Sequence, residues 1–319
     1  MKKNISKCLA IVVPCLNEQE VLLKTNNELL TLLHALTENN LINLKSYILF
    51  VDDGSFDDTW TIIKQLCEKH KSVRGLKLSK NFGHQNALLA GLTRVNNKCD
   101  FVVTIDADLQ QDINAIPEMI EKYYSGAEIV FGIRNSRTGE PIFKKVTGIL
   151  FNKIIKILGG NLIKDHADFR LMGNNALKAL LQHSENNIFI RGLVSNLGFQ
   201  TSIVKFHQHK RKLGKTKYNL FRMFNLAYNG LSSLTVTPLR FLFLIGLLST
   251  FVSIMWVIYV FYVKYITGQV VPGWASIVLS IWVFSSIQLV ALGLIGEYLS
   301  KIFLDVKKRP RFIIENEAE

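Results

Sequence analysis

The chain has 319 residues, of which 49% are hydrophobic and 20% charged, and its formal net charge is +13. A mean hydropathy of +0.21 with ordinary charge content excludes a disordered chain and is unusual for a purely soluble protein. The four cysteines are too few and too scattered for a disulfide scaffold, and no C-x-x-C pair indicates zinc, so we expect reduced, buried thiols.

Apolar runs alternate with amphipathic stretches up to about residue 206. The runs are predicted to be strands at 9–13, 47–51, 73–78, 101–105 and 129–131, and the stretches between them helices at 20–36, 59–69, 85–95 and 115–125. Continuous apolar strands separated by helices are typical of a mostly parallel sheet covered on both faces. We therefore expect an α/β domain that binds ligands at the carboxyl ends of its strands. Residues 1–7 lead directly into the first strand, so no signal peptide is expected.

Polar side chains follow four of these strands. They are Asn17 and Glu18, Asp52 and Asp53, the segment 81–84, and Asp106 and Asp108. Because the carboxyl ends of parallel strands share one edge, this set indicates a nucleotide and metal site. Each residue taken alone is as typical of a helix N-cap, the role expected for Asp57 and Asp58.

The tripeptide Asp106-Ala107-Asp108 follows the fourth strand. In an extended stretch, residues two apart point the same way, so the two carboxylates are expected to face one cation. A hard cation such as Mg²⁺ takes oxygen ligands and often bridges to substrate phosphates.

Two long runs without charge follow Pro238, at 241–263 and 275–296. Each is long enough, at about 1.5 Å per helical residue, to cross a hydrocarbon core of about 30 Å. We expect two transmembrane helices; the alternative is a pair of buried core helices. The connection 264–274 holds one basic residue, whereas Lys and Arg cluster at 211–240 and 301–311. The positive-inside rule therefore places both termini in the cytoplasm.

The segment 218–233 repeats apolar residues at helical spacing with few charges. It is predicted to be a helix lying on the membrane surface, with a soluble amphipathic core helix as the alternative. The excess positive charge lies beside the predicted spans, where anionic lipid is a nearer partner than nucleic acid, so no nucleic acid is expected.

Six segments resemble, in order and spacing, the family 2 glycosyltransferases, which have the GT-A (Rossmann-like) fold. They are VVPCLNEQE, VDDGSFDDT, NFGHQNALLAGL, DADLQQD, DFRLM and RKLGKTKY. The ending IGEYLSKIFLDVKKRPRFII resembles the polyprenyl-phosphate glycosyltransferases, which include bactoprenol glucosyltransferases and, more distantly, dolichol-phosphate mannose synthases. One departure is DADLQQDINAIPE in place of DADLQDPPE, with Gln111 inserted and the proline pair absent. It concerns the loop beyond Asp108 and not the two carboxylates.

The resemblance implies a donor site. Pro14, Leu16, Glu18, Val51 and Asp53 would line the nucleotide base and ribose, and Leu16 replaces an aromatic residue common there.

It also implies a metal. Asp106 and Asp108 would hold Mg²⁺ or Mn²⁺ on the pyrophosphate of the nucleotide-sugar, beside the Ala107 backbone. Arg134 would begin a mobile loop over the donor.

The reacting centre is implied by later motifs. Asp168 and Arg170 would lie near it, and Arg211 and Lys217 would contact phosphates, including that of a lipid acceptor. A phosphate monoester is already largely a dianion at neutral pH, so a strong general base is dispensable. Asp168 is therefore expected to orient the acceptor, with a structural carboxylate paired to Arg170 as the alternative.

Three histidines near these motifs are not expected to take part in the reaction. His84 and the pair His207 and His209 are expected to be polar surface or capping residues.

The expected organisation is a GT-A domain at 1–217, an interfacial segment at 218–240, a transmembrane hairpin at 241–300 and a basic cytoplasmic tail at 301–319. The expected reaction is inverting transfer of one sugar, UDP-glucose being the first choice of donor, to undecaprenyl phosphate, for modification of a cell-surface glycan. UDP-GlcNAc and GDP-mannose remain alternatives, and homo-oligomerisation is left open. A processive polysaccharide synthase is disfavoured, because only two spans are available and no Q-x-x-R-W segment occurs. A non-catalytic assembly protein is disfavoured by the intact Asp106 and Asp108 pair.

Overall fold

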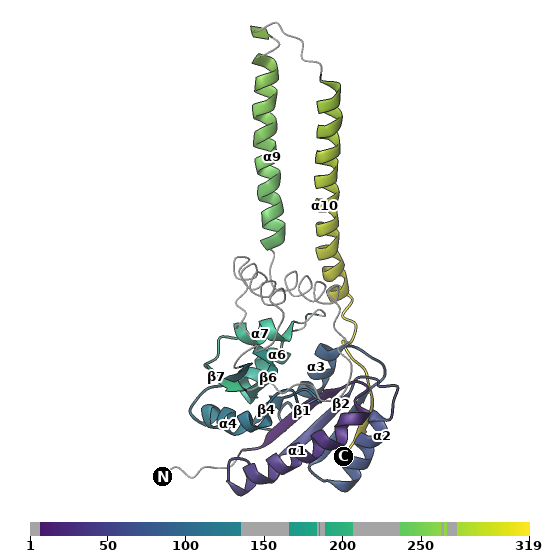
Figure 1. Ribbon diagram of the computed structural model, residues 1–319, viewed down its shortest axis with the longest axis vertical. Coiled ribbons are helices and arrows are strands. Elements are labelled where there is room, and N and C mark those ends of the chain that lie inside the picture. The colour runs from purple at the N-terminus through teal and green to yellow at the C-terminus, as the bar shows by residue number, and fades with distance from the viewer. Residues whose placement is uncertain are drawn as a thin grey trace.

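The computed structural model describes residues 7–134, 166–183, 185, 189–206, 237–262, 265–266 and 273–319. Within them, eight strands form one sheet in the order β7-β5-β6-β4-β1-β2-β3-β8 (Figure 1). The strands are β1 (Leu9–Cys15), β2 (Tyr47–Asp52), β3 (Val73–Leu78), β4 (Phe101–Thr104), β5 (Ile129–Arg134), β6 (His166–Gly173), β7 (Thr201–Phe206) and β8 (Ile314–Ala318).

Helices cover both faces of the sheet. On the first face lie α1 (Gln19–Glu38), α2 (Thr59–Lys69) and α4 (Ile116–Tyr124), and on the second α3 (His84–Val95), α6 (Asn174–Leu181) and α7 (Ile190–Asn196). A short 3₁₀ turn, Ile113–Ala115, precedes α4. β1 is wholly buried and belongs to both resulting cores, as its unbroken apolar sequence predicts.

The five predicted strands and four predicted helices are present, with ends shifted by at most a few residues. The predicted parallel arrangement is confirmed for β3-β2-β1-β4. The prediction of a mostly parallel sheet is confirmed for six of the eight strands, since β5 and β7 run in the same direction as these four; only β6, between β4 and β5, and β8, beside β3, run antiparallel. The sheet is therefore mixed.

Helix α3 approaches the sheet closely because position 91 is glycine. A Cβ atom there would lie 2.5 Å from Cγ1 of Val12 and 2.9 Å from Cγ2 of Val51. The absence of a side chain lets the helix backbone rest on β1 and β2. This contact fixes where the first residue of α3, His84, stands relative to the strand ends.

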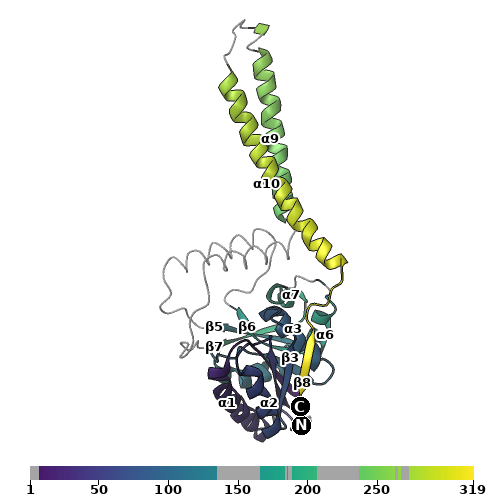
Figure 2. The same ribbon diagram turned by 90° about the vertical axis from the view of Figure 1, so that its right-hand side faces the viewer.

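Two long apolar helices extend away from the sheet. α9 (Thr237–Tyr262) and α10 (Trp274–Val306) run side by side, and the face carrying α3, α6 and α7 is the one turned toward them (Figure 2). α9 begins and ends near the predicted limits, whereas α10 begins where predicted but continues ten residues beyond the predicted end at 296. Within the described part of the chain, the stretch Ser280–Val306 is long and apolar enough to cross a membrane. Its side chains are largely exposed, Trp282 by 71% and Leu289 by 70%. The alternative of buried core helices is therefore wrong for α10.

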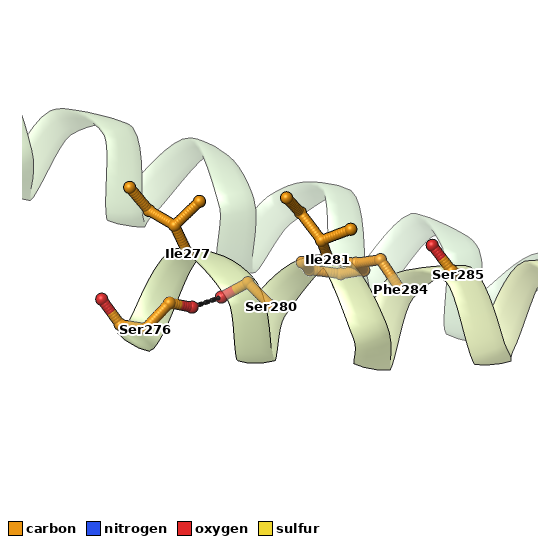
Figure 3. A pocket seen from close by; sticks show the side chains of 6 residues that line it. All are labelled: Ser276, Ile277, Ser280, Ile281, Phe284 and Ser285. Atoms are coloured by element: carbon orange, nitrogen blue, oxygen red, sulfur yellow. Dashed lines mark hydrogen bonds between the residues drawn. The ribbon is translucent and has the colours of Figure 1, made fainter. Parts of the chain in front are cut away.

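A hollow of about 450 Å³ lies on α10, where this helix faces α9 (Figure 3). It is lined by Ser276, Ile277, Ser280, Ile281, Phe284 and Ser285. The Ser280 hydroxyl donates to the carbonyl of Ser276 at 2.7 Å, which is the usual arrangement of a serine inside a helix. The lining carries no charged group, so it does not suit a nucleotide.

The chain after α10 returns to the sheet. The segment expected as a basic tail instead continues α10 to Val306 and ends in β8, which covers the outer edge of β3. Lys77 and Glu315 form an ion pair at 2.9 Å across this edge, and Arg94 of α3 pairs with Glu317. The apolar helix α10 is thus joined to the sheet through the short segment 307–313 and β8. The predicted interfacial segment and Arg211, Lys217, His207 and His209 lie outside the described residues.

Candidate active site

The loops after β1 and β2 are tied together by backbone and side-chain hydrogen bonds. The Asn17 backbone adopts a left-handed conformation (φ +53°), which asparagine tolerates. Its side-chain oxygen accepts from the Phe56 N–H at 2.9 Å, and its own N–H donates to the Ser55 hydroxyl at 2.9 Å. The segment that follows β1, including the half-buried Leu16 and Glu18, is thereby held at the carboxyl edge of the sheet.

Asp53 fixes the loop that leads into α3. Its two carboxylate oxygens accept from the backbone N–H groups of Phe82 (2.8 Å) and Gly83 (3.0 Å). Burial raises the pKa of Asp53 despite these two hydrogen bonds. Gly54 (φ +69°) permits the approach, since a Cβ there would lie 2.4 Å from the Lys80 carbonyl carbon. Asp53 therefore holds in place the loop that leads to His84.

The segment Asp106-Ala107-Asp108 is a turn and not the extended stretch that was expected. β4 ends at Thr104, and Leu109 has a positive φ of 50°. The Ala107 carbonyl accepts from the Thr25 hydroxyl of α1 at 2.6 Å. Because the chain turns here, the expectation that an extended backbone would point both carboxylates the same way is wrong.

Gln111, the inserted residue, is buried and forms two hydrogen bonds with Asp106. Its side-chain oxygen accepts from the Asp106 backbone N–H at 3.0 Å, and its side-chain nitrogen donates to Oδ2 of Asp106 at 2.5 Å. Because Gln111 binds Oδ2, the other oxygen of Asp106, Oδ1, faces Nε2 of His84 at 3.8 Å. The loop that departs from the family pattern therefore orients the first carboxylate of the pair.

A buried charge cluster surrounds Asp168 of β6. Arg191 of α7 contacts both its oxygens, at 3.0 Å from Nε and 2.6 Å from Nη2. Arg170 donates to Oδ1 at 2.5 Å, and Nε2 of His84 lies 3.4 Å from Oδ2. The structure thus joins Asp168, predicted as a site residue, to Asp106 through His84.

The cluster sets the protonation of its members. Burial alone would raise the pKa of Asp168, but Arg191, His84 and Arg170 hold it well below its usual range. Burial alone would lower the pKa of His84, but its hydrogen bond to Asp168 and the charge of Asp106 leave it raised. Asp168 is therefore a permanently ionised anchor and a poor general base.

Arg170 is completely buried, and two of its nitrogens, Nε and Nη1, have no hydrogen-bond partner among the described residues. An unsatisfied buried donor of a charged group is costly. An anion such as a phosphate oxygen would satisfy it, which suits a site for phosphorylated substrates.

The carboxylate pair fits a hard divalent cation by its donor chemistry. Burial is the main cause of a raised pKa at Asp106, and the negative charges of Asp168 and Asp108 add to it, so a nearby cation would relieve the strain. Among the residues that the structure describes, no three His, Cys, Asp or Glu side chains form a metal cage. Asp106 and Asp108 could then hold the ion only together with substrate oxygens or water.

The remaining predicted residues occupy the same region. Pro14 and Val51 are buried at the ends of β1 and β2, and Arg134 is half-buried at the end of β5. The sequence analysis counted His84, as part of the segment 81–84, among the polar residues at the strand ends, but its interpretation as a surface or capping residue is wrong, because its ring faces Asp106 and Asp168. Arg191 was missed, and no pattern pointed to it.

Comparisons with known proteins show which proteins this chain resembles. Residues 10–181 match the profile described as Glycosyl transferase family 2. The uncharacterized glycosyltransferase YkoT of Bacillus subtilis is 44% identical over 98% of this chain and 93% of its own. The bactoprenol glucosyl transferase of Shigella phage SfV is 33% identical over 98% of this chain and 99% of its own. Among solved structures, mannosyl-3-phosphoglycerate synthase from Rubrobacter xylanophilus aligns over 72% of this chain and 73% of its own, at 17% identity and a TM-score of 0.45.

Proposed function

The chain belongs to glycosyl transferase family 2, and from that premise we propose that it transfers a single sugar from a nucleotide-sugar to a polyprenyl phosphate. The donor of first choice is UDP-glucose and the acceptor undecaprenyl phosphate. The product would be a lipid-linked sugar that supplies a cell-surface glycan. Relatives at 33% identity that are named bactoprenol glucosyl transferases support this acceptor.

One observation carries the proposal. The cluster of His84, Asp168, Arg170 and Arg191 lies against the carboxylate of Asp106, at the carboxyl edge of a sheet that is joined through β8 to the apolar helix α10. A site for phosphorylated groups is thus tethered to a helix able to enter a membrane. This combination suits a substrate with a phosphate head and a long apolar tail.

The donor would bind along the ends of β1, β2 and β4. In this arrangement Pro14, Leu16, Glu18, Val51 and Asp53 line the base and ribose. Mg²⁺ or Mn²⁺ held by Asp106 and Asp108 would neutralise charge on the leaving diphosphate.

Two further residues would complete the donor site. The Ala107 backbone lies beside the pyrophosphate, and Arg134 begins the segment that covers the donor.

The acceptor phosphate would meet the arginine side of the cluster. The free N–H groups of the buried Arg170 suit a phosphate oxygen, and Arg211 and Lys217 supply further charge. Asp168, ionised and bound to two arginines, orients these cations and takes no proton. The acceptor dianion attacks without a strong base. A single attack opposite the leaving diphosphate inverts the configuration at the anomeric carbon.

The membrane arrangement follows from the helices. We propose that α9 and α10 both span the cytoplasmic membrane as the hairpin 241–300, with the connection outside and both termini in the cytoplasm. The domain 1–217 and the interfacial segment 218–240 then lie on the cytoplasmic side. This places the strand ends within reach of the lipid headgroup.

The test is a donor panel with purified protein in detergent, undecaprenyl phosphate and a divalent cation. We expect one donor, UDP-glucose before UDP-GlcNAc or GDP-mannose, to give undecaprenyl phosphate carrying one hexose by mass spectrometry. A polymer on the lipid would favour a processive synthase instead. No product with any donor, from protein that binds UDP, would favour a non-catalytic assembly protein.

A further inference from the structure

Two cysteines meet at the edge of the sheet opposite the candidate site. Cys8 precedes β1 and Cys99 precedes β4, two adjacent strands in which Leu9 pairs with Phe101. The Cys8 carbonyl accepts from the N–H groups of Asp100 (3.0 Å) and Phe101 (3.3 Å), so the two chain segments are already held together. The two sulfur atoms lie 2.9 Å apart.

Both thiols are nearly enclosed, each with 7% of its surface exposed. They belong to the same buried cluster as Tyr47, and the Arg74 guanidinium stacks 3.9 Å from the centre of the Tyr47 ring. The hydrogen bond from Cys99, together with the charges of Arg74 and Lys45, lowers the pKa of Cys8 despite burial. The same pairing and burial raise the pKa of Cys99. Of the two thiols, Cys8 is therefore the easier to deprotonate.

The other two cysteines are different. Cys15 and Cys67 are also free and buried, and burial raises the pKa of each. The hydrogen bond recorded for the Cys15 thiol is to the Val13 carbonyl and not to another sulfur. Cys8 and Cys99 therefore form an adjacent pair of thiols, and Cys15 and Cys67 serve as matched controls for it.

We propose that Cys8 and Cys99 form a reversible intramolecular disulfide when the protein meets a peroxide. The Cys8 thiolate attacks one peroxide oxygen; the O–O bond breaks, and the released hydroxide takes a proton to become water. The resulting Cys8 sulfenic acid is attacked by the Cys99 sulfur, and the sulfenic hydroxyl leaves with the Cys99 thiol proton as a second water. Two electrons pass from the two sulfurs to the peroxide.

The bond would join the starts of two central strands. It closes the chain from residue 8 to residue 99, and a loop of that length loses much of its freedom in the unfolded state. β1 has seven residues, so the bond lies about 20 Å from the strand ends that carry the site. Oxidation should therefore strengthen the fold and leave nucleotide binding unchanged.

The experiment uses the full-length protein in detergent, treated with hydrogen peroxide, quenched and denatured. The number of reactive thiols should fall from four to two, and proteolysis without reductant should release a peptide pair linking Cys8 to Cys99. The melting temperature of the folded protein should rise by about 5 °C or more. Dithiothreitol should restore four thiols and the original melting temperature.

Variants separate the pair from general oxidation. Cys8→Ser and Cys99→Ser should each abolish the linked peptide, whereas Cys67→Ser should keep it. Should a serine variant fail to fold, the peptide map of the wild type decides alone. Four reactive thiols after peroxide, links involving Cys15 or Cys67, links between two chains, or sulfinic acid at Cys8 without a linked peptide would each overturn the proposal.

Discussion

At the scale of single residues, Asp168 holds together charges that would otherwise repel. Its carboxylate is 5% exposed and binds Arg170 and Arg191, of which Arg170 is fully buried. The attraction offsets the cost of removing the charges of Asp168 and Arg170 from water, while Arg191 stays partly exposed. Removing the carboxylate would leave two neighbouring arginines without compensation.

We therefore expect Asp168→Asn to lower stability by about 3–5 kcal/mol, the usual cost of breaking a buried ion pair from one side. The pKa of Asp168 is depressed, so its contribution is complete above the unfolded value, about 4, and is lost only as pH falls through the lower folded value. The wild type should then keep its advantage over the variant throughout the neutral range. Melting temperatures in detergent check this, and equal values at neutral pH would refute the anchoring role.

A second prediction at this scale concerns Gln111, whose side-chain oxygen and nitrogen both form hydrogen bonds with Asp106. Gln111→Ala should leave Asp106 free to rotate and should raise the Mn²⁺ concentration needed for half-maximal transfer roughly five- to a hundredfold, the equivalent of about 1–3 kcal/mol. The measurement is Mn²⁺ titration of the transfer rate. The exposed Gln65, changed to Ala, is the control. An unchanged Mn²⁺ requirement in Gln111→Ala would show that these hydrogen bonds support the fold but do not prepare Asp106 for the metal.

At the scale of elements, helix α3 links the core to the site. Its close contact with β1 depends on Gly91, its first residue is His84, and the loop before it is held by Asp53. The position of His84 is therefore set by packing several turns away.

Gly91→Ala should push α3 from the sheet, because the new Cβ would lie 2.5 Å from Val12. We expect a loss of about 1–3 kcal/mol, typical of overpacking, and partial recovery in the double variant with Val12→Ala. Gly293→Ala in α10, where nothing lies within 4 Å of the new atom, is the matched control. Melting temperatures of the three variants decide: equal values for Gly91→Ala and Gly293→Ala would contradict the close contact.

At the scale of the whole molecule, the sheet and the apolar helices form one connected body. α10 continues through a short segment into β8, which is the last strand of the sheet beside β3. Any movement of α10 in a membrane is thereby limited by the catalytic sheet.

The proposed hairpin topology predicts which side of the membrane each position faces. A cysteine replacing Gln269, in the connection between the helices, should react with a membrane-impermeant maleimide in intact cells. A cysteine replacing Glu319, at the end beyond β8, should react only after the cells are opened. Labelling of both positions, or of neither, in intact cells would contradict two spans with cytoplasmic termini.

The extent to which the sequence predicts this molecule differs between its parts. β1 to β5 are apolar runs and were predictable, whereas β8 (IENEA) has no apolar run because it only covers an edge and stays exposed. β6 carries Asp168 and Arg170 into the core, where the two form an ion pair, so the polarity of this strand disguised its central place in the sheet.

The site shows the same limit. Asp106 and Asp108 follow a strand and were found from local pattern, but the turn at Leu109 was not. His84 and Arg191 meet at Asp168 only through tertiary packing, which no spacing along the chain reports.

The measurement that tests the central claim most directly is transfer of radiolabelled sugar from the preferred donor to undecaprenyl phosphate, read as label extracted with the lipid. We predict transfer by the wild type, loss of that transfer in EDTA, and recovery on adding Mn²⁺ or Mg²⁺. Asp106→Asn and Asp108→Asn should each lower the transfer rate at least about a hundredfold. Melting temperatures check that the two variants are folded. Undiminished lipid labelling by the two folded variants would contradict the account, because the reaction would then not take place at the ends of β1, β2 and β4.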